Sequence, residues 1–214
     1  MDILNTLHLE SNKQIKINFD GGDLSSDAGL LLIKEFAAKI GFSKLIKNKF
    51  KTNDKSVRFH KDNENLMQMI YQIIAAYFED DCADELTHDP VFQAILDKNA
   101  LASQPTLSRF FNRMDEDTLR QFDDIDQRLR DIVYSIKHPE HILLDLDSTL
   151  LGTYGHQEGE GFNFHYQAHG YHPLLCYDGL TGDLLKAELR NGTLHCSNDA
   201  EKFIEPLLKE YMDR

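Results

Sequence analysis

The hydrophobic pattern changes its period near residue 141, and this change constrains the fold more than any other feature. Over residues 66–77 and 119–136 the apolar side chains recur three or four positions apart, which is the spacing of one helix face. From residue 141 short apolar runs replace them, such as HILLDLDST and YHPLLCYDG, and such runs are typical of strands. The sequence therefore predicts an α+β fold, with a mainly helical region at 1–140 followed by strands and one helix at 141–214.

Turn and capping residues subdivide the start of the chain. Residues 15–19, IKINF, alternate apolar and polar side chains and predict a short strand. The following Asp20-Gly21-Gly22 has the composition of a turn. A helix is then expected to begin at a cap formed by Ser25 or Ser26 and to stop at Gly41.

Further helices are expected along the rest of the chain. Residues 63–78 carry a strong amphipathic pattern, and Asp89-Pro90 is a cap followed by proline at the first helical position. Residues 103–113 predict another short helix, and 115–136 a long one that ends before Pro139. Residues 197–213 also predict a helix, and Pro206 is expected to kink or break it.

The net charge of −13 taken alone argues against a nucleic-acid partner. It is an average, however, because residues 34–61 carry a local charge of +7 and residues 62–214 a charge of −17. A basic patch of this kind can contact phosphates within an acidic protein, although charge runs are usually just solvated. The candidate DNA contacts in this patch are Lys44, Lys47, Lys49, Lys51 and Arg58.

A second group of candidate DNA contacts lies on the short helix expected at 103–113. Hydroxyl and guanidinium groups on a helix that follows a helix and a loop are typical of a recognition helix. A surface helix of an all-helical bundle explains the pattern equally well. The residues are Thr106, Ser108, Arg109 and Arg113.

The sequence favours a cytoplasmic protein. The N-terminus lacks the basic and apolar segments of a signal peptide, and no apolar stretch is long enough to span a membrane. Cys82, Cys176 and Cys196 are scattered without a CxxC pair, so they are expected to be reduced thiols rather than a disulfide framework.

Asp145 and Asp147 are the strongest candidates for catalysis. On a strand, residues two apart share one face, so both carboxylates point away from the face that holds Leu144 and Leu146. A carboxylate in an apolar strand is costly unless it is paired or bound to a metal, and Mg²⁺ prefers oxygen ligands. A simple turn at Asp147 is an equally good explanation of the spacing alone.

Five histidines fall within forty residues and raise a second hypothesis, a histidine-ligated transition-metal site. Glycine-rich surroundings make a helix doubtful there, so the spacing of His165 and His169 does not fix a ligand geometry. A polar loop or hairpin with solvated histidines is the better interpretation. The five are His156, His165, His169, His172 and His195.

Several segments together resemble the insertion-sequence transposases that carry a DDE domain of the first group. Their order and spacing extend over about 160 residues. The segments are Phe19-Asp20-Gly21-Gly22 with Leu24 and residues 26–32, residues 104–109, residues 144–149, Tyr154-Gly155 with residues 157–159, and residues 171–175.

The resemblance implies a helical region that engages transposon ends and a ribonuclease H-like catalytic domain. It maps the first catalytic carboxylate, which is also a metal ligand, to Asp147, with Asp145 as the fallback. The implied chemistry is hydrolytic nicking and strand transfer at phosphodiesters with two Mg²⁺, or Mn²⁺, ions. The implied partner is DNA carrying terminal inverted repeats, and a homodimer in a synaptic complex is left open.

The resemblance also implies that this chain is catalytically incomplete. The family places its second Asp on a strand after the helix expected at 197–213 and its Glu further on, and the sequence contains neither position. We therefore expect the N-terminal portion of a transposase that is inactive alone, with an unclosed sheet and an exposed edge. Two alternatives are a non-catalytic protein that binds DNA ends or other subunits, and a histidine-ligated metal hydrolase.

Overall fold

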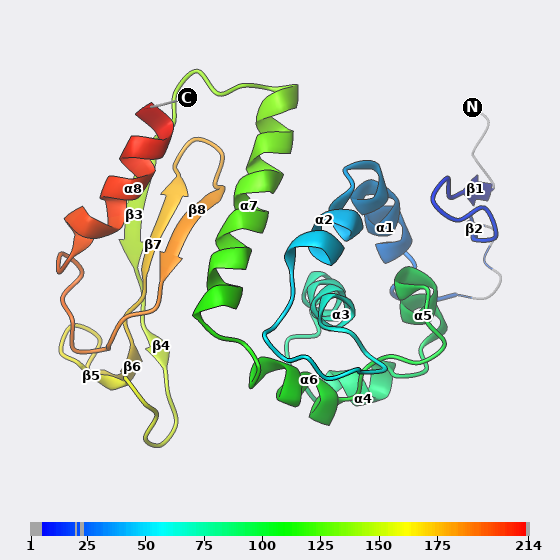
Figure 1. Ribbon diagram of the computed structural model, residues 1–214, viewed down its shortest axis with the longest axis horizontal. Helices are drawn as coiled ribbons and strands as arrows, with labels where there is room; N and C mark the ends of the chain where they lie inside the picture. The colour runs from blue at the N-terminus through cyan, green and yellow to red at the C-terminus, as the bar shows by residue number, and fades with distance from the viewer. Residues whose placement is uncertain (1–5, 20, 22–23, 213–214) are drawn as a thin grey trace. The chain divides into compact units, whose positions relative to one another are not determined.

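The computed structural model describes residues 6–19, 21 and 24–212, and the chain divides into two compact units, Met1–Ile132 and Val133–Arg214. The division falls within the longest helix, and the boundary expected at residue 140 falls shortly after that helix ends. Each unit is described by itself (Figure 1). Within the described residues, none of the helices has the length and apolar composition needed to cross a membrane.

The first unit is mainly helical. A small antiparallel pair precedes the helices, and residue Thr6 lies opposite Asn18 in it. The buried side chains of the unit gather around Phe50, Phe92 and Phe110, and the rings of Phe50 and Phe110 meet edge to face with centroids 5.9 Å apart. The elements are β1 (Thr6–His8), β2 (Lys16–Asn18), α1 (Leu30–Lys39), α2 (Phe42–Lys49), α3 (Asp62–Ile74), α4 (Cys82–Leu86), α5 (Pro90–Leu96), α6 (Gln104–Phe111) and α7 (Glu116–Ile136).

A buried glutamine fastens the loop before α6 to helix α3. The side-chain amide of Gln68 donates to the carbonyl of Ala102, and its carbonyl accepts from the N–H of the same residue, each at 2.8 Å. Both groups of Ala102 are buried and would otherwise lose their hydrogen bonds with water. The pair therefore fixes where α6 begins relative to α3.

The predicted start of the first helix is wrong. Helix α1 begins at Leu30, not at Ser25 or Ser26, because the chain first makes tight turns in which Leu30 donates to Asp27. Gly41 does end the helix, in the left-handed region with φ +72°. The turn predicted at Asp20 and Gly22 lies outside the described residues.

The helix predicted at 63–78 ends early, at Ile74. Ala76 takes the left-handed conformation with φ +66°, its N–H donates to Ile73, and the N–H of Tyr77 donates to Gln72. This is the Schellman arrangement that closes a helix, usually with glycine at the left-handed position. With alanine there, the sequence carries no signal for the stop.

The second unit contains two small antiparallel sheets and one helix. The larger sheet has the order β3-β7-β8 and the smaller β4-β6-β5. Helix α8 packs against the larger sheet (Figure 1), where Phe203 and Leu207 join Cys176 and Leu185 in a buried cluster. The elements are β3 (Leu144–Ser148), β4 (Leu151–Gly152), β5 (Gly161–Asn163), β6 (Ala168–Tyr171), β7 (Leu174–Asp178), β8 (Leu184–Glu188) and α8 (Ala200–Met212).

The predicted α+β class and the order of three strands and a helix are present, as β3, β7, β8 and α8. The smaller sheet, inserted between β3 and β7, was not predicted. Among the described residues β3 pairs only with β7, so the larger sheet is open and β3 lies at its edge. Of the kink or break predicted at Pro206, the break is absent, because α8 runs through this residue. Pro206 is exposed, and the flanking Phe203 and Leu207 hold both halves of the helix to the sheet.

Candidate functional site

The candidate carboxylates lie on β3 as the sequence predicted. Asp145 and Asp147 are exposed on one face, while Leu144 and Leu146 pack on the other against the α8 cluster. Asp147 lies opposite Leu175 on β7, near the end of the strand. Its Oδ1 accepts a hydrogen bond of 2.7 Å from the N–H of Ser148, and the side chain remains accessible.

A pocket of about 470 Å³ opens beside Asp147 and Ser148. The turn after β5 forms one wall, and the loop that follows β8 forms another. Asp145 is not among the lining residues. The walls comprise residues 163–166, His172 and residues 193–196. The structure thus places one of the two candidate carboxylates, Asp147, at a concave site.

Buried Asn163 organises this pocket. Its Oδ1 accepts from the backbone N–H groups of His165 and Tyr166 at 3.0 and 3.1 Å, which shapes the turn after β5. Its Nδ2 donates to the carbonyl of Gly192 at 2.8 Å, which joins this turn to the loop after β8. The hydroxyl of Tyr166 donates to the carbonyl of Ser148 at 3.3 Å. One side chain therefore connects two walls, and a second reaches the residue next to Asp147.

Two histidines in the pocket walls have different hydrogen-bonding roles. His172 is 4% exposed, and its Nδ1 donates to the carbonyl of Leu194 at 2.7 Å, so Nε2 of the neutral ring is an acceptor. The Nδ1 of His195 accepts from the N–H of Ser197 at 3.3 Å, so Nε2 carries the proton. The two rings offer an acceptor and a donor.

The histidine-rich segment does not converge on one metal centre. His169 and His156 lie beside Glu160 instead, with Nδ1 to carboxylate distances of 2.9 and 3.6 Å. The hydrogen bond from His169 is the largest influence that lowers the pKa of Glu160. Within the described part of the chain, no group of three His, Cys, Asp or Glu residues could hold a metal ion. The structure gives the histidine-ligated metal hypothesis no support.

The same finding tests the Mg²⁺ or Mn²⁺ site that the transposase resemblance implies. Asp145 and Asp147 share a face of β3, and oxygen ligands of this kind suit either ion. The described residues add no third carboxylate to them. These two side chains alone do not complete a two-metal site.

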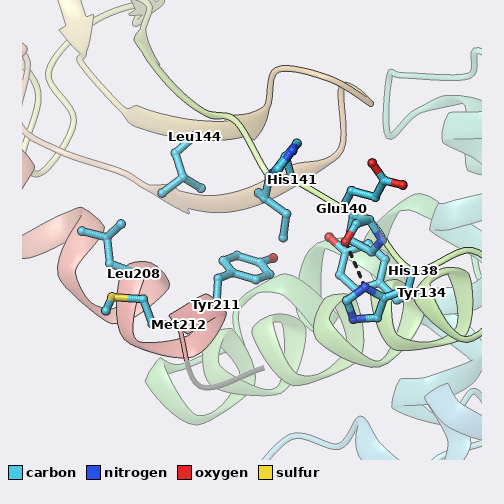
Figure 2. A pocket seen from close by; sticks show the side chains of 10 residues that line it. Tyr134, His138, Glu140, His141, Leu144, Leu208, Tyr211 and Met212 are labelled. Atoms are coloured by element: carbon cyan, nitrogen blue, oxygen red, sulfur yellow. Dashed lines mark hydrogen bonds between the residues drawn. The ribbon is translucent and has the colours of Figure 1, made fainter.

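A second hollow of about 450 Å³ lies near the opposite end of β3, and Figure 2 shows the side chains around it. Leu144, Leu208 and Met212 border one part of it, with Tyr134 and His138 on another. Its walls are mainly apolar and hold neither Asp145 nor Asp147. Its titratable groups include His138, Glu140 and His141, which precede β3 in the chain.

Ion pairs occupy several of the basic residues proposed to contact DNA. Lys49 pairs with Asp124 at 3.0 Å, and Arg58 pairs with Asp54. The exposed lysines Lys44 and Lys47 on α2, and Lys51 after it, take part in no ion pair among the described residues. Among the residues of this segment proposed to contact DNA, these three lysines therefore carry the accessible charge that no acidic neighbour pairs with.

The candidate DNA contacts of the helix predicted at 103–113 also differ in how accessible their side chains are. Arg109 is exposed, whereas Thr106 and Ser108 are partly buried. The side chain of Arg113 is 12% exposed, and its guanidinium group donates to Asp62 at 2.8 Å. The helix predicted at 103–113 ends at Phe111, so Arg113 lies in the turn after α6 and ties this turn to the start of α3. Arg109 is the accessible cation of α6 itself.

We expect Arg113→Ala to lower the free energy of unfolding at pH 7 by about 2 kcal/mol, because Asp62 then loses a charged partner. Burial alone raises the pKa of Asp62, but hydrogen bonds from Thr52 and Arg113 outweigh it and hold the pKa below its ordinary value. Such a carboxylate contributes stability above its unfolded pKa of 3.8, and the contribution is lost as pH falls through the folded pKa.

Urea unfolding at pH 7 and near pH 3 checks this expectation. The difference between the wild type and Arg113→Ala should narrow at the lower pH. Arg109→Ala is the matched control, because Arg109 lies nearby in α6 and is exposed. An equal loss at both pH values would mean that packing of Arg113 on Phe110, and not the charge on Asp62, causes the effect.

The fold and the site together define a class: an α+β protein with an accessible strand-end carboxylate beside a pocket, and a helical unit with surface lysines. The family model described as "Transposase DDE domain group 1" matches residues 7–214. The chain therefore belongs to this transposase family, and the resemblance in the sequence is confirmed. Comparison with curated proteins and with solved structures gives no match. Membership implies a DNA substrate and a metal-dependent parent activity.

Sequence reasoning missed most of the pocket around Asp147. The histidine pattern predicts solvated loop residues or metal ligands at His165, His172 and His195, and no pattern singles out Asn163 or Tyr166. The role of Asn163 depends on Gly192, which lies 29 residues away. No local pattern announces such a contact.

Proposed function

We propose that this chain supplies the first catalytic carboxylate, Asp147, of a DDE transposase that nicks and joins DNA at transposon ends. The proposal includes a ribonuclease H-like domain, of which β3, β7, β8 and α8 are the first elements. Its chemistry is phosphodiester hydrolysis and strand transfer with Mg²⁺ or Mn²⁺, which binds water and polarises phosphate oxygens. The observation that carries it is the accessible Asp147 at the end of β3, in a chain of this family.

The surroundings of the two carboxylates support Asp147 over Asp145. Asp147 adjoins the pocket, where a DNA end can approach, whereas Asp145 lies in the middle of β3, opposite Tyr177. The hydrogen bond from the N–H of Ser148 holds one oxygen of Asp147 and leaves the other for a ligand. Asp145 is the fallback.

Cleavage by this centre requires carboxylates beyond those on β3. A two-metal site needs several oxygen ligands around both ions, and the described residues offer no group of three. We propose that the 214-residue chain does not cleave DNA alone. This observation also favours the second candidate function, a non-catalytic protein that binds DNA ends or other transposase subunits.

The helical unit is proposed to bind the terminal inverted repeats through Lys44, Lys47, Lys51 and Arg109. All four are exposed cations, and phosphate contacts from such residues make DNA binding dependent on salt. Arg58, Lys49 and Arg113 contribute less in this proposal, because acidic neighbours already occupy them. Thr106 and Ser108 remain candidate contacts from α6.

A gel shift with inverted-repeat DNA and with a shuffled duplex tests the binding proposal. We expect tighter binding to the repeat. Changing Lys44, Lys47 and Lys51 together to Gln should weaken binding to both duplexes and reduce the salt slope, by about one unit for each phosphate that the variant no longer neutralises. Lys49→Gln is the matched control on α2 and should have little effect.

Three outcomes are informative. Equal affinity for the repeat and the shuffled duplex would contradict specific end binding. Unchanged binding by the triple variant would contradict the proposal that Lys44, Lys47 and Lys51 contact DNA. Metal-dependent cleavage by the 214-residue chain would show that the carboxylates on β3 need no additional partners, and would contradict the non-catalytic candidate.

A further inference from the structure

We propose that the pocket beside Asp147 binds the base of an unpaired nucleotide at a processed DNA end. This inference rests on the proposed function, since it presumes that DNA reaches Asp147. It adds a binding site for a nucleobase, formed by the turn after β5, His172 and the loop after β8. The pocket volume of about 470 Å³ lies in the range of small-molecule sites.

The turn after β5 presents aromatic rings to this pocket. Phe164 is 81% exposed, so its ring is accessible to a ligand. Tyr166 is held more firmly, because its ring meets His165 and His172 edge to face, with centroids 4.8 and 5.9 Å apart. Its hydroxyl donates to Ser148. Exposed and positioned rings of this kind are what unpaired bases stack on.

The polar groups of the pocket suit a base better than a phosphate. The described lining contains no lysine or arginine, and it contains the carboxylate of Asp147, which repels an anion. His172 offers an acceptor at Nε2, and His195 offers a donor at Nε2. A base edge displays both donors and acceptors, so a neutral pair of this kind complements it.

An unpaired base fits this site and a paired base does not. In a duplex both faces of a base are covered by its neighbours, and enzymes that bind a base in a pocket take it out of the stack or use single strands. Tyr166 is joined to Ser148, directly after Asp147. The bound nucleotide would therefore lie within one or two positions of the phosphodiester at Asp147.

The pocket is formed in the absence of DNA. Asn163 hydrogen-bonds to the two N–H groups of its own turn and to Gly192 in the opposite wall. The backbone N–H of His172 donates to Arg190 at 3.0 Å, and the Arg190 side chain donates to the His172 carbonyl at 3.2 Å. A site held by such contacts orders few groups when it binds, which favours affinity.

Aminopurine fluorescence tests the inference with the full 214-residue chain. The probes are an inverted-repeat duplex with a short single-stranded overhang containing aminopurine, and the same duplex with a blunt end. We expect the overhang to raise affinity roughly tenfold, because a stacked base contributes that order of binding. Aminopurine fluorescence should fall on binding, since stacking quenches it.

Phe164→Ala and Tyr166→Ala should each remove most of the overhang preference and the quenching, and leave binding of the blunt duplex unchanged. Tyr166→Phe keeps the ring and should retain the quenching. Tyr154→Ala is the matched control, because Tyr154 is 97% exposed in the same unit and does not line the pocket. Thermal unfolding of each variant monitors the fold.

The possible results separate this inference from the proposed function. If the wild type binds both probes equally, or if the alanine variants keep the overhang preference while folded, the base pocket is wrong and end binding stands. If quenching is lost equally in Tyr154→Ala, the base stacks elsewhere and the pocket is again wrong. If neither probe binds, the proposed function fails and the base pocket fails with it.

Discussion

Asp147→Asn is expected to abolish Mg²⁺-dependent cleavage of transposon ends in a protein that carries the complete set of catalytic carboxylates. Asparagine has nearly the same shape as aspartate, and its side-chain oxygen can still accept from Ser148, so the fold should persist. The change removes the negative charge and replaces one metal-binding oxygen by an NH2 group, which only donates hydrogen bonds. If that charge accounts for about 4 kcal/mol of stabilisation at the metal centre, the cleavage rate falls roughly a thousandfold.

The measurement is a time course of end nicking on labelled DNA, together with a gel shift on the same DNA. End binding should remain within about twofold of the wild type. Substituting an exposed residue away from Lys44, Lys47 and Lys51 should change the binding free energy by less than about 0.5 kcal/mol. Asp145→Asn is the matched control from the same face of β3. If Asp145→Asn stops cleavage and Asp147→Asn does not, the roles of the two carboxylates are exchanged.

The parts of the fold that follow from local pattern were predictable. Long periodic stretches indicated α7, and the apolar runs indicated β3, β7 and β8 in the correct order. The cap at Asp89 also formed as expected, with Oδ1 accepting from Val91 and Phe92 at 2.9 Å. In each case the signal and the hydrogen bonds that satisfy it lie within a few residues of each other.

The errors arose where distant or unusual contacts decide the structure. Ala76 closes α3 in a conformation that alanine rarely adopts, so composition could not reveal it. The charge count of +7 treated every cation of residues 34–61 as accessible. Lys34 is buried against Asp97 and Lys49 pairs with Asp124, and these partners lie 63 and 75 residues away. Charge patterning alone cannot distinguish an internal ion pair from a DNA contact.

The position of the candidate carboxylate could be predicted from the sequence, whereas the pocket beside it could not. The alternation around Asp147 marks a strand face, which is a local property. The pocket needs Asn163 to meet Gly192 and Tyr166 to meet Ser148, and both contacts depend on the unpredicted sheet β4-β6-β5. A short strand such as β4 has only two residues, too few to show a period.

Gly192→Ala is expected to separate this small sheet from the loop after β8. A Cβ at residue 192 would lie 2.1 Å from the carbonyl oxygen of Gly170 and 2.4 Å from that of Gly161. Both oxygens belong to the backbone of β5 or β6, so neither can turn away as a side chain can. We expect the free energy of unfolding to fall by about 3 kcal/mol. The clash should also displace the backbone at residue 192, whose carbonyl accepts the hydrogen bond from Asn163. The wall of the pocket beside Asp147 should therefore move as well.

Gly152→Ala in β4 is the matched control, because a Cβ there meets no atom within 4 Å. Urea unfolding gives the stability, and hydrogen exchange at β5 and β6 shows whether the loss is local. Overhang binding should disappear in Gly192→Ala and persist in Gly152→Ala. If Gly192→Ala is as stable as the control, residue 192 does not pack against β5 and β6. If it is unstable but still quenches aminopurine, the base does not need the wall that Asn163 and Gly192 hold together.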